Sequence, residues 1–341
     1  MKAVVLEEPL KFVVADICEP DGPGPGEALV RVHRVGICGS DVAGYLGKMP
    51  FYGYPRIPGH ELGVEVLEIG NGVDHLAVGD RCAVEPYINN PASFASQRGH
   101  DNCCNDLQVL GIHTDGGLRS RFVVPARKLH VSTKLEMEQL ALVETLGIGC
   151  HAIDRCQPPA NEHLLVIGAG PIGLSVIEFA RQARAKITVM DMNRSRLEFC
   201  RDNMGVDHIV QFAGDGSELN ELQRITGGEF YLAVLDATGS VASMSGALNY
   251  VAWGGTLVFV GLSSTEISFP QPLMHTREMT FLASRNSLPR DFHRVIGLIE
   301  DESIDTRPWI THRIGMQELV ADFEQFTRPE SGVIKAIVQV D

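Results

Sequence analysis

The sequence predicts a two-part α/β protein, in which a β-rich region precedes a doubly wound parallel sheet. A chain of 341 residues exceeds the size at which one hydrophobic core keeps growing, so two domains are expected. Up to about residue 150, short apolar or alternating runs are separated by Gly, Pro and Asp clusters. Between about 162 and 262, strand-like and helix-like segments alternate, which implies a parallel sheet with helices on both faces.

The individual elements follow from these patterns. In the β-rich region the expected strands are 28–35, 63–69, 81–84 and 118–124. In the alternating region the expected strands are 163–167, 186–190, 208–211, 231–235 and 256–260. The expected helices are 171–183, 195–204, one ending near 225, and 243–251. After about residue 287, helix and strand return without that rhythm.

Composition narrows the class of protein. With 44% apolar and 21% charged residues, the chain has the profile of a soluble globular protein. Its net charge of −14 argues against a general nucleic-acid or anionic-membrane binder. The N-terminus lacks the apolar run of a signal peptide, and the eight scattered cysteines need no disulfides. We therefore expect a cytoplasmic protein that acts on small molecules, without a nucleic-acid or membrane partner.

A candidate metal site lies in the β-rich region. Cys38 belongs to the run Gly-Ile-Cys-Gly-Ser-Asp, and His60 and Glu61 belong to Gly-His-Glu. Thiolate, imidazole and carboxylate, with a position left for water, form the ligand mixture of a catalytic zinc. Because 22 positions separate the cysteine from the histidine, only the fold can bring them together. The alternative is a buried cysteine beside an unrelated histidine.

A candidate nucleotide site opens the alternating region. The motif joins the first strand to the first helix through Gly168, Gly170, Pro171, Ile172 and Gly173. Its glycines permit a tight turn and a close approach of a pyrophosphate to the helix N-terminus. Asp191, which closes the second strand, can accept the ribose hydroxyls and so favours NAD. The nearby Arg194 and Arg196 leave binding of the phosphorylated cofactor as an alternative, because an arginine can accommodate its 2′-phosphate. Arg196 is expected instead to reach across the cofactor or face solvent. A purely structural turn is the alternative.

These motifs together resemble the zinc-dependent medium-chain dehydrogenase family, in its sorbitol, threonine and sugar-acid branch. The likeness runs from the opening Met-Lys-Ala-Val-Val to the closing Gly332-Val-Ile-Lys-Ala-Ile-Val. It implies a discontinuous GroES-like catalytic domain, residues 1–147 and 287–341, with a Rossmann domain, residues 148–286, inserted into it. The resemblance also implies that zinc and NAD meet in the cleft between these domains.

The resemblance assigns roles around the metal. Cys38, His60 and Glu144 become zinc ligands, and Glu144 stands in a stretch where Thr145 replaces the family's proline. Glu61 becomes either a ligand that exchanges with water or a carboxylate just behind the ligands. Which glutamate binds zinc directly stays open.

Three nearby residues complete this implied machinery. Asp41 would orient the ligating imidazole, although an Asx-type turn is its alternative. Ser40 would bind the alcohol and pass its proton to the nicotinamide ribose, while hydride passes to NAD. Many relatives carry a relay histidine where this chain has Ala43, so the proton must leave by another route.

The family's second, structural zinc is not expected here. Its four cysteine positions read Asn90, Ser93, Ser96 and Cys104. Amide and hydroxyl groups are poor zinc ligands, and the neighbouring Cys103 cannot restore a tetrahedral site. We expect one zinc per subunit and a lobe held by hydrogen bonds and packing.

The substrate is indicated by two segments, residues 110–117 and 283–292, which resemble bacterial L-galactonate and L-gulonate 5-dehydrogenases. Such a hexonate carries a carboxylate, for which Arg285 is the first candidate partner. Its alternative is a structural arginine. Further pocket candidates, each with a scaffold or core alternative, are Tyr45, His113 and Asn286.

The sequence therefore predicts an NAD- and zinc-dependent dehydrogenase of a sugar acid, oxidised at C5. The same chemistry on sorbitol or another polyol, on threonine or on a diol is the alternative. A non-catalytic nucleotide-binding scaffold is a remote one. A homodimer or homotetramer is expected, with residues 256–260 and 267–269 offering a sheet edge for pairing.

Overall fold

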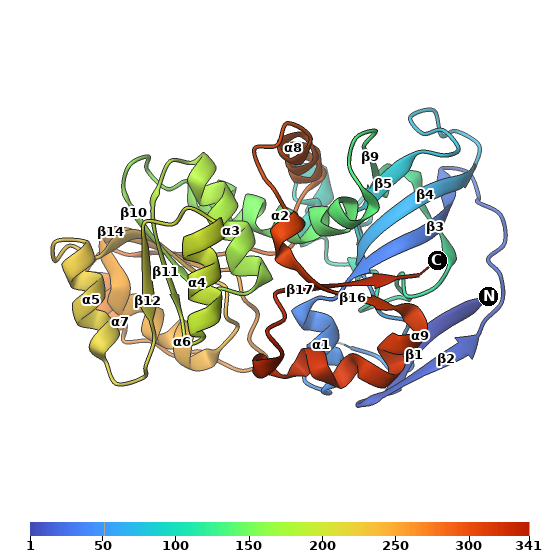
Figure 1. The fold of residues 1–341 in the computed structure, drawn as a ribbon. Coiled ribbons are helices and arrows are strands. Elements are labelled where there is room, and N and C mark those ends of the chain that lie inside the picture. Colours follow the sequence, from blue (N-terminus) through green and yellow to red (C-terminus); the bar gives the residue numbers. More distant parts are fainter. Residues whose placement is uncertain (51, 341) are drawn as a thin grey trace. The chain divides into compact units, whose positions relative to one another are not determined.

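The computed structural model describes residues 1–50 and 52–340 and divides the chain into two compact units (Figure 1). Unit 1 comprises residues 1–144 and 287–341, and unit 2 comprises residues 145–286. One unit is therefore discontinuous in sequence, and the other forms from a single insertion. The insertion starts at Thr145, slightly before the expected residue 148.

Unit 2 is built on a six-stranded parallel sheet in the order β12-β11-β10-β13-β14-β15. Its strands are β10 (His163–Ile167), β11 (Lys186–Asp191), β12 (His208–Gln211), β13 (Tyr231–Asp236), β14 (Val251–Phe259) and β15 (Thr280–Ala283). Strand order reverses between β10 and β13, which lie side by side. In doubly wound sheets, ligands bind beyond the carboxyl ends of the strands at this reversal.

The helices that follow these strands begin at recognisable caps. Pro171 takes the first turn of α3, where its missing N–H costs nothing, and the Asn193 side chain caps α4. The helices are α3 (Pro171–Gln182), α4 (Arg194–Asn203), α5 (Ser217–Ile225), α6 (Val241–Gly246), the 3₁₀ helix η4 (Ala247–Tyr250) and α7 (Gln271–Thr276). A long helix, α2 (Met137–Cys156), begins in unit 1 and ends in unit 2.

One expectation for this sheet is wrong. The helix predicted near 243–251 is present as α6 and η4 and ends at Tyr250, because Val251 pairs with Tyr231 and already belongs to β14. Residues 256–260, however, do not form a sheet edge, since β14 is hydrogen-bonded between β13 and β15. Among the described residues, 267–269 form no strand. The proposed pairing edge is therefore wrong, and the homo-oligomer stays a prediction.

Unit 1 is dominated by a seven-stranded sheet in the order β16-β17-β3-β4-β5-β9, with β8 paired to β3. These strands are β3 (Glu27–Gly36), β4 (Glu61–Ile69), β5 (Arg81–Val84), β8 (Arg121–Pro125), β9 (Leu129–Val131), β16 (Ile310–Gly315) and β17 (Lys335–Gln339). The small sheets pair β1 (Lys2–Glu8) with β2 (Lys11–Asp16), and β6 (Tyr87–Ile88) with β7 (Gln108–Val109). The last strand, β17, thus lies beside β3, near the opposite end of the sequence (Figure 1).

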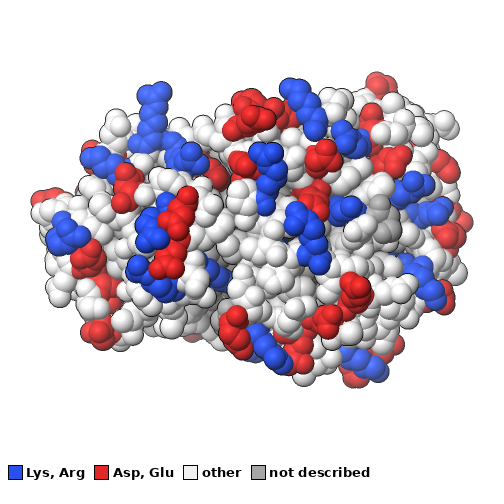
Figure 2. All heavy atoms as spheres, in the orientation of Figure 1, with Lys and Arg blue, Asp and Glu red and all other residues white. Residues whose placement is uncertain are grey.

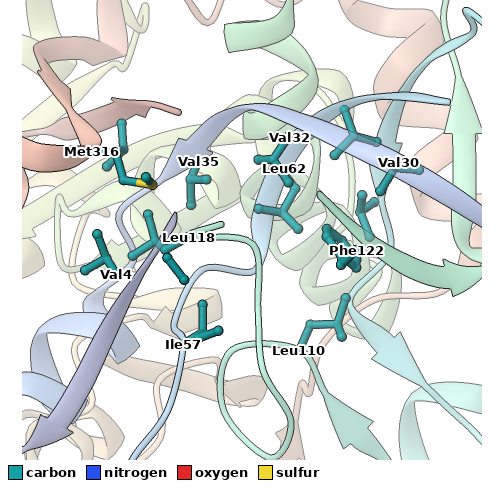
Figure 3. Close-up of a cluster of buried hydrophobic side chains, with 14 of the residues drawn as sticks. Val4, Val30, Val32, Val35, Ile57, Leu62, Leu110, Leu118, Phe122 and Met316 are labelled. Carbon is teal, nitrogen blue, oxygen red and sulfur yellow. The ribbon is translucent and has the colours of Figure 1, made fainter. Parts of the chain in front are cut away.

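Helices of unit 1 flank these sheets. They are α1 (Gly39–Tyr45), α8 (Pro289–Glu300), α9 (Met316–Asp322) and the 3₁₀ helices η1 (Ser96–Arg98), η2 (Asp101–Cys103), η3 (Ala126–Lys128), η5 (Arg307–Trp309), η6 (Phe323–Thr327) and η7 (Pro329–Ser331). The alternating side chains of β3 and β4 supply much of the core (Figure 3). Val35, Leu62 and Leu118 are fully or almost fully buried there, which fixes the register of β3 against β4.

The surface carries charges of both signs. On the face drawn in Figure 2, basic and acidic side chains are interspersed despite the net negative charge. Within residues 1–50 and 52–340, no helix is both long enough and apolar enough to cross a membrane.

Candidate metal centre and nucleotide-binding turn

The ends of two neighbouring strands bring the predicted metal ligands together. Cys38 follows β3 as the N-cap of α1, and His60 immediately precedes Glu61, the first residue of β4. One ligand atom from each of the three lies within 4.8 Å of the others. The imidazole and the carboxylate are buried, whereas the cysteine is half-buried. Cys38 and His60, which are 22 positions apart in the sequence, therefore lie in one cluster.

A glycine makes room for this cluster. Gly36 stands opposite Glu61 in the β3–β4 pairing. A Cβ atom at Gly36 would lie 2.0 Å from Glu61 Oε2, far inside contact distance. A side chain there would displace the carboxylate, so the small residue is a condition for the cluster.

Asp41 lies both at the start of α1 and beside His60. Its Oδ2 accepts a hydrogen bond of 2.9 Å from the backbone N–H of Cys38, which fixes the start of α1. Its Oδ1 lies 3.8 Å from His60 Nδ1, and among the described residues neither atom has a hydrogen-bond partner. The other ring nitrogen, Nε2, lies 3.4 Å from Ser40 Oγ. The imidazole is thus placed between a carboxylate on one side and a hydroxyl on the other.

Lys335 is a member of the site that the sequence reasoning missed. From the first position of β17, its Nζ donates to both carboxylate oxygens of Glu61, at 2.6 and 2.7 Å. Both side chains are almost completely buried. Burial alone would lower the pKa of Lys335, but the charges of Glu61 and Cys38 raise it. The available signal was a lysine inside the otherwise apolar run Val333–Val338.

Tyr87 is a second missed member. Its hydroxyl donates to Glu144 Oε1, and both side chains are buried. Glu144 projects from α2 beside the cluster, where burial raises the pKa of its carboxyl although the charge of His60 lowers it. Among the described residues, no hydrogen bond reaches its second oxygen, Oε2. Burial and the charge of Glu144 raise the pKa of Tyr87, so the phenol keeps its proton and donates.

This donor set fits a divalent metal. One thiol and three carboxyl groups, those of Cys38, Asp41, Glu61 and Glu144, lie near one imidazole, and Lys335 is bonded to Glu61. Burial alone would lower the pKa of His60, but the charges of Asp41 and Cys38 raise it well above its usual range. A cation is therefore favoured at this position. Thiolate, imidazole and carboxylate are the ligands that zinc binds.

The glycine motif forms a turn from β10 into α3. Gly168 has φ of 99°, a conformation that side-chain-bearing residues rarely adopt. A Cβ atom at Gly173 would lie 1.8 Å from the Gly168 carbonyl oxygen, so helix and turn approach each other too closely for a side chain. Gly170 caps α3 in an extended conformation, leaving free N–H groups at the helix start.

Asp191 lies against this turn. Its Oδ2 accepts a hydrogen bond of 2.6 Å from Ala169 N, and its Oδ1 accepts one of 2.7 Å from Asn193 N. The carboxylate is thereby fixed at the end of β11, next to the glycine motif. The side chain of Arg196 reaches the same turn: its Nη1 would lie 3.7 Å from a Cβ atom added at Gly170.

The cysteine-poor lobe, residues 89–104, is joined by hydrogen bonds. Asn89 Nδ2 donates to Ser96 Oγ at 2.9 Å and to Asp101 Oδ1 at 2.7 Å. Arg127 donates to the side chain and the backbone oxygen of Asn89, at 2.6 and 2.8 Å. Cys104 Sγ is 3.4 Å from Asn90 N, which donates to it. Ser93 Oγ accepts from the backbone of Ser96. These contacts link all four positions at which the family's cysteines would stand.

The four substrate candidates have different surroundings. Tyr45 is buried in the core, stacked on Phe12 with ring centroids 5.5 Å apart, as its core alternative predicts. His113 Nδ1 accepts from Val109 N within its own turn, as its scaffold alternative predicts. In unit 2, Arg285 is exposed, and Asn286 has φ of 53°. Among the described residues, Asn286 Nδ2 is buried without a hydrogen-bond partner.

Comparison with known proteins identifies the class of protein that this fold and site define. Residues 24–134 match the alcohol dehydrogenase GroES-like domain, and residues 171–301 match the zinc-binding dehydrogenase domain. The chain belongs to the zinc-binding alcohol dehydrogenase family, whose members are enzymes. It is 33% identical to the L-galactonate-5-dehydrogenase of Escherichia coli K12, over 99% of this chain and 98% of that protein.

Solved structures agree with this assignment. The alcohol dehydrogenase RspB from E. coli CFT073, complexed with NADH, superposes with a TM-score of 0.91 and is 28% identical, covering 100% of this chain and 99% of that chain. A zinc-binding dehydrogenase from Sinorhizobium meliloti 1021, bound to NADP, has a TM-score of 0.90 and 25% identity, with 99% of each chain covered. The neighbours thus include proteins bound to either nicotinamide cofactor.

Proposed function

We propose that this chain oxidises a secondary hydroxyl of a hexonate-type sugar acid, using NAD and one zinc ion held by Cys38, His60 and Glu144. The observation that carries the proposal is the convergence of Cys38, His60 and Glu61 at the ends of β3 and β4, with Glu144 on α2 close enough to raise the pKa of His60. Zinc bound there would act as a Lewis acid on the substrate hydroxyl, and NAD would accept hydride. The relationship to an L-galactonate 5-dehydrogenase supports oxidation of a sugar acid at C5.

The chain's own residues divide the remaining tasks. Ser40 Oγ, 3.4 Å from His60 Nε2, is placed to hydrogen-bond the substrate hydroxyl and take up its proton. Asp41 fixes the imidazole orientation through its position beside Nδ1. Because Ala43 cannot carry a proton, release from Ser40 requires the ribose, water or another group.

The choice between the two glutamates favours Glu144 as the direct ligand. Both oxygens of Glu61 already bond the buried ammonium of Lys335, which neutralises that carboxylate. Glu144 has one oxygen that no described residue binds. Glu61, whose carboxylate is part of the cluster, then serves as the group that can exchange with water on the metal.

NAD is favoured over NADP by Asp191. A carboxylate fixed at the end of β11 can accept the ribose hydroxyls and would repel a 2′-phosphate. Arg285 is the proposed partner of the substrate carboxylate, because a guanidinium can bind a carboxylate through two hydrogen bonds. Oxidation of sorbitol, another polyol, threonine or a diol is the nearest alternative.

The test is NAD reduction with a panel of C4–C6 aldonates, polyols, diols and threonine, before and after zinc removal by a chelator. We expect L-galactonate or L-gulonate to give the highest kcat/KM, activity to vanish on chelation, and zinc to restore it. Arg285→Ala should raise KM for the acids more than for the matching polyols. Full activity in demonstrably zinc-free protein would contradict the metal role, and a preference for uncharged polyols would contradict the substrate class.

A further inference from the structure

The inference concerns the buried hydrogen bond from Tyr87 to Glu144, and it rests on the proposed function because it takes Glu144 as a zinc ligand. The tyrosine hydroxyl donates to one carboxylate oxygen, Oε1. Among the described residues, no donor reaches the other oxygen, Oε2. The two oxygens of one carboxylate are therefore placed in different surroundings before any metal binds.

We propose that Tyr87 is a positioning residue, which occupies Glu144 Oε1 so that only Oε2 binds the metal. A carboxylate bound through one oxygen uses one coordination position, whereas a carboxylate bound through both uses two. Zinc in catalytic sites has three protein ligands and keeps an open position for water or substrate. With Cys38 and His60 as the other ligands, restricting Glu144 to one oxygen keeps that position open.

The chain holds Tyr87 firmly enough for this role. Its ring is buried, 3% exposed, and it lies on β6, where it pairs with Val109 of β7. Immediately before it, the Pro86 carbonyl accepts a hydrogen bond of 3.0 Å from Leu110 N. Two residues beyond it, Asn89 is held by Arg127 through two hydrogen bonds. The hydroxyl therefore has little freedom to leave Glu144.

This support links the cysteine-poor lobe to the metal centre. Asn89 begins the lobe's hydrogen-bond network through Ser96 and Asp101. The same residue anchors the strand that carries Tyr87. Hydrogen bonds in the lobe thus stabilise the strand that presents the positioning hydroxyl.

Behind Tyr87 stands a further hydroxyl. Ser287 is buried, and its hydroxyl lies near that of Tyr87. Among the described residues, Ser287 Oγ has no hydrogen-bond partner of its own. It can donate to the phenol oxygen, whose own proton then stays directed at Glu144.

The test replaces Tyr87 with Phe, which removes the hydroxyl and keeps the ring. Metal-free protein is titrated with Zn²⁺ in competition with a chromophoric chelator, and with Co²⁺ to read ligand geometry from the visible absorption bands. We expect Tyr87→Phe to weaken Zn²⁺ binding about 10- to 100-fold, the range for loss of a group that orients a metal ligand. We also expect a change in the Co²⁺ bands, which report coordination number.

Tyr250→Phe is the matched control. Tyr250 is also buried, and its hydroxyl donates to Glu218 at 3.1 Å, but this pair belongs to unit 2. The Tyr250→Phe substitution removes a comparable tyrosine–glutamate hydrogen bond and should leave Zn²⁺ affinity and the Co²⁺ bands unchanged. In a Glu144→Ala background, Tyr87→Phe should have no further effect on affinity, because its action passes through that carboxylate.

The outcomes separate this inference from the proposed function. If Tyr87→Phe binds Zn²⁺ as the wild type does, with unchanged Co²⁺ bands, while Cys38→Ser has lost binding, the metal centre stands and the positioning role is wrong. Undiminished Zn²⁺ binding by Cys38→Ser would overturn the metal centre and this inference with it. Circular dichroism and the urea midpoint of each variant verify that the fold is intact.

Discussion

At the scale of single residues, some members of the metal centre were predictable from sequence motifs and others were not. Cys38, His60 and Glu61 were found because their types match zinc chemistry, and the structure brings them together. Lys335 and Tyr87 were missed, since their partners are distant in sequence and neither residue type is a zinc ligand. For Tyr45, the core alternative is the one that the structure shows, because its ring packs on Phe12.

The buried pair of Lys335 and Glu61 gives a prediction at this scale. Lys335→Met should lower the free energy of unfolding of the metal-free protein by about 3 kcal/mol, because it removes the buried ammonium that donates to both oxygens of the buried Glu61 carboxylate. Adding Glu61→Gln should recover part of that loss. Urea unfolding measures both variants.

Lys2→Met is the control for this prediction, because it removes a lysine–aspartate pair that is exposed to solvent. Exposed pairs contribute little, so its urea midpoint should match that of the wild type. A Lys335→Met protein as stable as the control would show that the buried pair is not needed to hold Glu61.

At the scale of elements, the parallel sheet of unit 2 was the most predictable part. β10 and β12 have the expected bounds, and β11 and β13 differ by one residue at the end. Strands that are buried on both faces have continuous apolar sequences, so a single residue that departs from the pattern does not prevent their prediction. The start of β14 was predicted at residue 256 but lies at Val251, because an irregular first pairing with Tyr231 follows directly on the helical turns of η4. Local pattern does not separate the two.

The cysteine-poor lobe gives the prediction at the element scale. Asn89→Ala should lower the free energy of unfolding by about 2 kcal/mol, because it removes the hydrogen bonds from the buried Asn89 side chain to Ser96 and Asp101 and the one it accepts from Arg127. Asn105→Ala is the control: Asn105 is exposed, and its amide bonds only the neighbouring Asp106. Equal urea midpoints for the two variants would mean that packing, not this network, holds the lobe.

At the scale of the whole molecule, the division into a discontinuous β-rich unit and an inserted parallel-sheet unit was predictable from the family resemblance. Composition and alternation alone predicted two domains, but not that residues after 287 return to the first unit. That return is what places β17, and with it Lys335, beside β3. Lys335 was therefore missed because its place beside the metal site depends on the topology of the chain, which its residue type does not indicate.

We expect a single zinc ion per chain, bound at Cys38 and not in the lobe that contains Cys104. The most direct measurement is the zinc content of purified wild type and of Cys38→Ser and Cys104→Ser, by elemental analysis after dialysis against metal-free buffer. We expect about one zinc per chain in wild type and Cys104→Ser, and none in Cys38→Ser. Two zinc ions in wild type, or zinc retained by Cys38→Ser and lost from Cys104→Ser, would contradict the account.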